Sequence, residues 1–353
     1  MPSAPAQPTA AAGVPRSGLR DRGYAIGRWR PAPPRPRLRA TIHCRESRPP
    51  SAVLAILSIE QRNRLFLLAL GLPAVVYVVL LAGGPLLEGL RWSLYDYNLL
   101  RPQRTAFAGF GNYLRLWNDP SAMRALLNTF LFTGLAVGLE MALGLALALA
   151  LWTDRPFERA ALVVMLVPVM ITPLAVGLIF KALLSAEFGL LGYWGRAAGV
   201  VGERGFFGDP VAAFASIVAI DAWQWTPLVA LILRAGLATI PAELIEAAAI
   251  DGATPWRKLR HVVLPLLLPA LLLALMLRVM DAFRLFDSVF VITKGGPGDA
   301  TNVLQLYAVK QGLEFFNIGY ASAIANLTLA CIAVLATAFV LLLRRADRRM
   351  AGR

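Results

Sequence analysis

Charged residues, cysteine and histidine are all scarce in this chain, and each scarcity excludes a class of protein. Charged residues make up 16% of the 353, whereas about 25% is usual for a soluble domain. The two cysteines, Cys44 and Cys331, lie in a polar segment and an apolar run, which argues against a disulfide framework. The two histidines are His43 and His261. From these positions the histidines and cysteines cannot supply four nitrogen or sulfur ligands that converge on one metal ion. We therefore expect no metal and no cofactor bound by this chain.

Sequence motifs of catalysis are missing as well. The chain has no G-x-x-x-x-G-K-[ST] phosphate loop, no H-E-x-x-H and no G-x-S-x-G. We expect that it is not an enzyme and that a partner chain hydrolyses any ATP that is used. One alternative stays open, because Tyr95-Asp96 and Gly296-Pro-Gly-Asp299 match the paired aspartates of intramembrane aspartyl proteases. Both matches are short and fall in expected external loops, which disfavours that interpretation.

Long apolar runs are abundant. Apolar residues make up 58% of the chain, against roughly 45–50% in soluble domains. Crossing about 30 Å of hydrocarbon takes ~20 residues, and backbone groups in lipid must pair within their own segment, which favours helices. The sequence thus predicts an all-α membrane domain over residues 65–345. Its six transmembrane helices are expected at residues 65–87, 125–151, 160–184, 211–233, 264–292 and 321–343.

The positive charge is concentrated outside these runs. Residues 1–64 hold 12 arginines and 10 prolines against 3 acids, a composition that cannot bury a core and predicts a disordered tail. The net charge of +14 is therefore not spread over a folded surface, and we expect no nucleic-acid partner. The tail is expected to touch anionic lipid, and a partner-binding arm is the alternative. A second, short tail is expected at residues 346–353.

Charge in the connections predicts the orientation. Discounting the distal tail, one side of the expected membrane domain carries 14 Lys and Arg and the other carries 9. Positive residues near the spans accumulate on the cytoplasmic side. Both termini are therefore predicted to be cytoplasmic.

A stretch between the fourth and fifth runs, residues 240–265, has the pattern of a helix–turn–helix on that side. Pro241 suits the first turn of a helix, Gly252 permits the left-handed conformation that ends one, and Thr254 with Pro255 caps and begins the next. Read by itself, this segment is either a connector on the membrane surface or a lever that transmits force to the spans.

The residues of this stretch also resemble a family signature. Glu246-Ala-Ala248, three residues, Gly252, nine residues, Val262, one residue and Leu264-Pro265 are similar to the EAA motif of ABC-importer permeases, with Val262 in place of the usual isoleucine. Further stretches resemble the carbohydrate branch, the maltose- and trehalose-type permeases. These are Ser93–Asn98, Leu127–Thr129, Trp225–Pro227, Asp281–Asp287 and Thr293–Gly298.

The resemblance covers about residues 60–345 and implies a type I ABC-importer permease that takes up a sugar or polyol across a bacterial inner membrane. It implies a second permease subunit in a heterodimer, two ATP-binding subunits or domains, and an extracytoplasmic solute-binding protein. The stretch at 240–265 would be the coupling helix that docks on the ATPase. The residues expected to couple are Glu246, Ala247, Ala248, Gly252, Arg257 and Lys258. Another solute, such as glycerol phosphate, and a passive channel remain alternatives.

Polar residues within the apolar runs are the candidates for the solute path, because charges in lipid are costly and turn inward. In the fifth run, Arg278, Asp281, Arg284 and Ser288 form one stripe on a helix, with Asp287 at its edge, and Arg278 and Arg284 can each pair with Asp281. In the fourth run, Asp221, Trp223, Gln224 and Trp225 offer aromatic and polar groups to a sugar, although tryptophan also anchors helices at interfaces. Glu140 and Asn326 are expected to hydrogen-bond between helices. The expected path residues are Asp221, Trp223, Gln224, Asp281, Arg284, Asp287 and Asn326, and Gln224 with Asp281 is the specific hypothesis.

Overall fold

The computed structural model describes residue 66 and residues 70–153 and 156–351. Contacts divide the chain into two compact units, Met1–Leu68 and Ala69–Arg353. Almost all of the first unit lies outside the described residues, including the tail expected over residues 1–64. The second unit contains residues 69–345 of the expected membrane domain.

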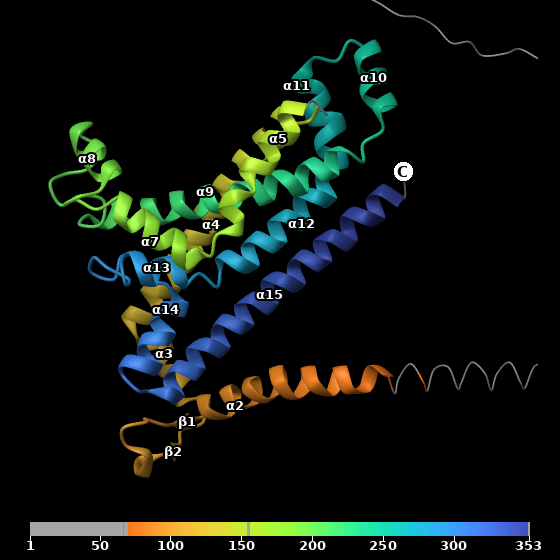
Figure 1. The fold of residues 1–353 in the computed structure, drawn as a ribbon. Helices are drawn as coiled ribbons and strands as arrows, with labels where there is room; N and C mark the ends of the chain where they lie inside the picture. The colour runs from red at the N-terminus through yellow and green to blue at the C-terminus, as the bar shows by residue number, and fades with distance from the viewer. Residues whose placement is uncertain (1–65, 67–69, 154–155, 352–353) are drawn as a thin grey trace, which may run out of the picture. The chain divides into compact units, whose positions relative to one another are not determined.

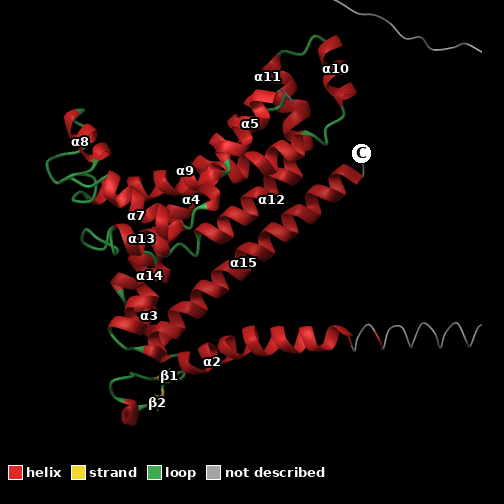
Figure 2. Cartoon of the chain, viewed as in Figure 1, coloured by secondary structure: helices red, strands yellow, loops and turns green. Residues whose placement is uncertain are grey.

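Helices dominate the described part of this unit, and two short strands form one antiparallel pair, β1 (Tyr95–Asp96) with β2 (Ala106–Phe107) (Figures 1 and 2). Helix also covers residues 70–78. The longest helices are α4 (Pro120–Ala150), α9 (Pro210–Leu237), α12 (Leu264–Ala282) and α15 (Ile318–Ala351). The shorter α-helices are α2 (Gly84–Ser93), α3 (Gly111–Asn118), α5 (Pro156–Met165), α6 (Val167–Met170), α7 (Pro173–Leu183), α8 (Leu190–Ala197), α10 (Ala242–Ile250), α11 (Pro255–Lys258), α13 (Asp287–Ile292) and α14 (Leu304–Val309). The π- and 3-10 segments are η1 (Val79–Gly83), η2 (Pro102–Arg104), η3 (Leu259–Val263) and η4 (Lys310–Glu314).

Five helical segments in the described residues are long and apolar enough to cross a membrane: Leu70–Ser93, Pro120–Ala150, Pro210–Leu237, Pro255–Ile292 and Ile318–Arg344. They confirm the helical class and match five of the six expected spans. Helix α15 continues to Ala351, through most of the residues expected to form the C-terminal tail.

The expectation of one continuous helix over residues 160–184 is wrong. Ala160–Met170 and Pro173–Leu183 meet at 92° across a short break, so this region is a broken span or a re-entrant loop. Thr172 precedes Pro173 and is extended, with φ −63° and ψ 141°. The proline ring disfavours helical geometry in the residue before it, so the chain turns there before α7 begins.

The fifth span is interrupted as well. Helix α12 ends at Ala282, and α13 begins at Asp287 after Phe286, whose φ of −141° is not helical. Arg284 lies between the two helices, so the expected single polar stripe is divided. In the described residues no ion pair joins Arg284 to Asp281, whereas the expected pair of Arg278 with Asp281 forms at 2.6 Å.

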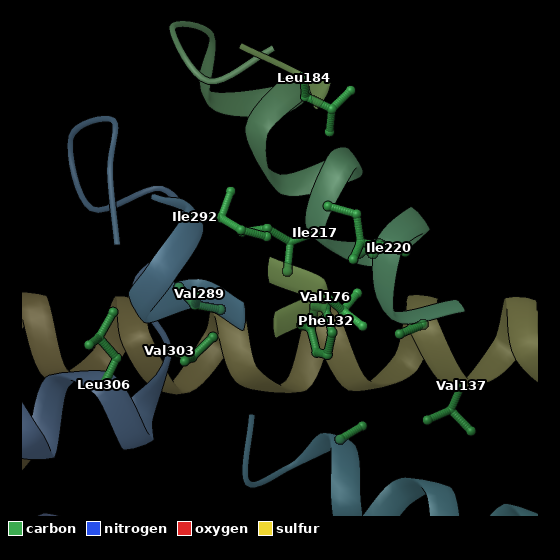
Figure 3. Close-up of a cluster of buried hydrophobic side chains, with 13 residues drawn as sticks. Phe132, Val137, Val176, Leu184, Ile217, Ile220, Val289, Ile292, Val303 and Leu306 are labelled. Carbon is green, nitrogen blue, oxygen red and sulfur yellow. The ribbon is translucent and has the colours of Figure 1, made fainter. Parts of the chain in front are cut away.

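Helix α4 packs most extensively against α9. A β-carbon placed on Gly144 would lie 2.6 Å from Cγ1 of Val229, so the absent side chain lets the two backbones approach closely. One buried cluster joins these helices to α7 and α13 (Figure 3). Figure 3 shows Phe132, Val176, Ile217 and Val289 converging on it.

Asp119 lies at the start of α4, at the end of the helix far from Gly144. It joins that end to α14 and α15. Its Oδ1 accepts the backbone N–H of Ser121 at 2.9 Å, and its Oδ2 accepts the hydroxyls of Tyr307 at 2.6 Å and Tyr320 at 2.7 Å. Burial by itself would raise the pKa of Asp119, but these hydrogen bonds hold it below the usual value. The carboxylate thus stabilises the junction at neutral pH, and that contribution is lost as the pH falls through the lowered pKa.

Replacing Gly144 with leucine should destabilise the protein by about 1–3 kcal/mol, the usual cost of overpacking, and lower its thermal midpoint in detergent. Gly138 lies on the same helix, and a β-carbon there would meet nothing within 4 Å. Gly138→Leu is therefore the matched control and should leave the midpoint near that of the wild type. Equal effects of both substitutions would contradict the close approach of α4 and α9.

Candidate substrate path and coupling segment

The guanidinium group of Arg278 on α12 is bound by carboxylates from three helices. Its Nε donates to Glu140 Oε2 at 2.6 Å, and its Nη2 donates to Glu140 Oε1 at 2.9 Å and to Asp221 Oδ2 at 3.0 Å. Its Nη1 donates to Asp281 Oδ2 at 2.6 Å. Glu140 belongs to α4, Asp221 to α9 and Asp281 to α12, so one side chain ties these helices together.

Burial makes these contacts necessary. Arg278 is 2% exposed, Glu140 0% and Asp221 5%. Removing an unpaired charge from water costs several kcal/mol, and the bidentate contact between Arg278 and Glu140 is the strongest way to offset that cost. The ring of Trp225 covers the guanidinium face, with 4.7 Å between the ring centroid and Cζ.

A pocket of about 260 Å³ opens beside this cluster. Both helix interruptions contribute to its lining: Pro173 comes from the bend in the third span, and Leu285 and Phe286 come from the break between α12 and α13. Irregular backbone at membrane depth is tolerated where it is buried in protein or lines a cavity. The two breaks and the ion cluster therefore define one candidate site within the bundle.

The structure brings four of the expected path residues together. Asp221, Asp281, Arg284 and Asp287 line this pocket, as does Trp225. Sequence reasoning missed Pro173, although a proline in an apolar run is a signal of a break. The role of these residues in solute transfer stays a prediction.

Three expected path residues lie elsewhere. Trp223 contacts Phe180 edge to face and lines a separate apolar pocket, because it projects from the other side of α9. Gln224 is buried, and its amide donates to the carbonyl of Ile171 at 2.9 Å, which stabilises the bend rather than lining the 260 Å³ pocket. Asn326 on α15 donates to the carbonyl of Gly89 at 3.2 Å, so it joins α15 to α2, the interhelical bond expected of it.

The expected helix–turn–helix is present as α10 and α11. Gly252 has a left-handed φ of 72°, which an L-residue adopts only at a cost. The Oγ1 of Thr254 accepts the backbone N–H of Arg257 at 3.4 Å, and Pro255 occupies the first turn of α11. The terminating turn, the cap and the second helix thus lie where the sequence predicts them.

One face of the α10–α11 segment packs against the helix bundle, and another face is exposed. Ile245 and Leu259 pack against a buried cluster formed by α4, α9 and α12. Ile250 is 86% exposed and Trp256 66% exposed. Among the expected coupling residues, Glu246, Ala247, Gly252 and Arg257 are exposed, whereas Ala248 and Lys258 are half-buried. The exposed apolar side chains lie at the tips of the motif, where a protein partner can reach them.

Comparison with known proteins agrees with these features. Residues 134–352 match the family described as binding-protein-dependent transport system inner membrane component. The chain belongs to this family. This permease is 31% identical over 300 residues to the trehalose transport system permease SugA of Mycobacterium tuberculosis, covering 84% of this chain and 94% of SugA. It is 34% identical over 271 residues to the trehalose/maltose permease MalF of Thermococcus litoralis, covering 76% and 89%.

The fold of this permease is also found in a solved transporter. A bacterial ABC transporter involved in the import of the acidic polysaccharide alginate superposes with a TM-score of 0.70 at 20% identity. The match covers 82% of this chain and 98% of the other. The helical membrane architecture of an ABC permease, expected from the sequence, is thereby confirmed.

Replacing Arg278 with methionine should destabilise the permease by about 3–5 kcal/mol, because Glu140 and Asp221 would remain buried without this partner. Adding Glu140→Leu to that variant should recover part of the loss, since one of the two stranded charges is removed. Thermal midpoints and yields of folded protein in detergent measure both. If the double variant were as unstable as the sum of its single variants, the Arg278–Glu140 pair would not be coupled.

Proposed function

We propose that this chain is the permease subunit of an ATP-driven importer and moves a carbohydrate, a sugar or polyol, across the bacterial inner membrane. Family membership and the trehalose and maltose relatives support this proposal. The main structural support for this proposal is the α10–α11 motif. One face of the motif packs against α9 and α12, while its apolar side chains Ile250 and Trp256 are exposed. A passive channel has no need of such a motif.

The complete importer needs partners. A second permease subunit completes the path as a heterodimer, two ATP-binding subunits or domains hydrolyse ATP, and an extracytoplasmic binding protein delivers the solute. The full sequence contains no G-x-x-x-x-G-K-[ST] phosphate loop, which supports assigning hydrolysis to the partners. Arg257 and Lys258 carry positive charge at the start of α11, where acidic groups of an ATP-binding partner would complement them.

The orientation follows from the same assembly. If α10 and α11 meet an ATP-binding partner, they lie in the cytoplasm. Two spans, Pro255–Ile292, which begins with α11, and Ile318–Arg344, lead from α10 to the C-terminus, and two crossings would return the chain to the cytoplasmic side. Three spans and the bent pair precede α10; if the pair crosses the membrane once, the N-terminal tail would be cytoplasmic as well, in agreement with the distribution of Lys and Arg.

In this mechanism, closure of the ATP-binding partners would move α10 and α11 as a rigid piece. Their packing against α9 and α12 would pass the motion to the helices that carry Asp221 and Asp281. The 260 Å³ pocket would then alternate its access between the two sides of the membrane. Carboxylates that accept hydroxyl hydrogen bonds, with the ring of Trp225 beside them, suit the polar and apolar faces of a sugar.

Reconstituted vesicles test the function. The complex of this chain with its partner subunits and binding protein should accumulate a radiolabelled sugar or polyol from a panel that includes trehalose, maltose and sorbitol. Accumulation should require both internal ATP and the binding protein. Entry that proceeds equally without ATP or without the binding protein would identify a channel instead.

Replacing Gly252 with valine should uncouple transport from ATP hydrolysis. A β-carbon there would meet nothing within 4 Å, so the effect would come from the left-handed backbone, which costs an L-residue about 1–2 kcal/mol. Gly252→Asn is the matched control, because asparagine tolerates this conformation. The valine variant should lose most uptake and most stimulation of ATPase activity by the binding protein, whereas the asparagine variant should keep both. Full activity of the valine variant would remove the turn from the mechanism.

A further inference from the structure

The charge balance of the 260 Å³ pocket bears on which carbohydrates can enter it. Three of its lining residues are acids, Asp221, Asp281 and Asp287, and one is a base, Arg284. Behind the lining, Arg278 and Glu140 add one charge of each sign. The site therefore holds two more acids than bases, and it stays negative even with one carboxyl group protonated.

Arg278 cannot serve as a receptor for an anionic solute. A guanidinium group has five N–H donors, and four of those of Arg278 are already directed at Glu140, Asp221 and Asp281. The ring of Trp225 covers the face of the group. A phosphate or carboxylate entering the pocket would have to displace a buried carboxylate to reach this arginine.

Arg284 does not reverse the balance. It lies in the break between α12 and α13, three residues after Asp281 and three before Asp287. Both of these carboxylates line the same pocket, so like charges in that pocket would repel an anion bound to Arg284. Hydroxyl groups, in contrast, can donate hydrogen bonds to ionised carboxylates, and they carry no negative charge that the carboxylates would repel.

We propose that this pocket admits neutral carbohydrates and excludes those that carry carboxylate, sulfate or phosphate groups. The inference rests on the proposed function and narrows its substrate class. It separates this chain from the importer of the acidic polysaccharide alginate that shares its fold, and it disfavours glycerol phosphate as the solute.

The test measures the field in the pocket with reactive probes of opposite charge. In the assembled complex, with Cys44 and Cys331 replaced by serine, Leu285→Cys places a thiol on the pocket lining. This thiol is modified with methanethiosulfonate ethyltrimethylammonium, a cation, and with methanethiosulfonate ethylsulfonate, an anion. For each reagent, the rate is divided by its rate with free mercaptoethanol, and the corrected ratio is the cation value over the anion value. Any shift in thiol ionisation affects both reagents equally, so the ratio reports the local potential.

The corrected ratio should favour the cationic reagent by on the order of tenfold. Asp287→Asn should lower the ratio several-fold, because in the described residues Asp287 forms no ion pair and its removal leaves Arg278 bound. Asp96→Asn, in the exposed hairpin strand β1, removes the same charge outside the pocket and should not change the ratio. Phe286→Cys provides a second position if Leu285→Cys does not fold.

A ratio near one, or one that favours the anion, would overturn the proposal, as would an unchanged ratio in Asp287→Asn. These outcomes are distinguishable from failure of the proposed function. If the complex accumulated no carbohydrate, the function would be refuted whatever the reagent rates. If it accumulated an anionic carbohydrate such as trehalose 6-phosphate faster than trehalose, the proposed function would be retained and the proposed exclusion of anionic carbohydrates would be refuted.

Discussion

The contact between Arg278 and three carboxylates is the interaction on which the site depends. It joins α4, α9 and α12 through a guanidinium group that is 2% exposed. A charge so deep in a membrane protein persists where partners surround it, and such groups commonly mark a functional path. Because Asp221 and Asp281 serve both the ion cluster and the pocket lining, the geometry of the pocket is fixed by the same bonds that hold the helices together.

The two helices that carry these carboxylates also lead to the proposed coupling segment, α10 and α11. Helix α9 ends at Leu237, shortly before α10 begins, and α12 follows directly from α11 through η3. Val229, Leu233 and Leu267 form the buried cluster on which the coupling segment packs. Close-packed interiors transmit displacement because they have little free volume. A movement of α10 and α11 would therefore have a short, well-packed route to the pocket, whose lining includes Pro173 and Phe286 from the two helix breaks.

Much of this could be predicted from the sequence, for physical reasons that differ from part to part. The α10–α11 motif depends on local chemistry, so Gly252, Thr254 and Pro255 were sufficient to place it. The spans follow from the length of the apolar runs. Tertiary contacts were harder: Glu140 was assigned to interhelical bonding without its partner, and Trp223 was grouped with Asp221 although the two lie on different sides of α9. Composition also concealed the bend at Thr172, because the residues on both sides of it are predominantly apolar.

The central claim is that α10 and α11 receive the motion of an ATP-hydrolysing partner, and site-specific photo-cross-linking tests it most directly. A benzophenone amino acid at Ile250, which is 86% exposed, should capture an ATP-hydrolysing subunit in the assembled importer, with a yield that changes on addition of ATP. The same group at Phe110, which is exposed and directly precedes α3, a helix at the other end of the bundle from α10 (Figure 1), should not capture it. A transporting complex in which Ile250 captured no such subunit, or in which Phe110 captured it equally, would contradict the account.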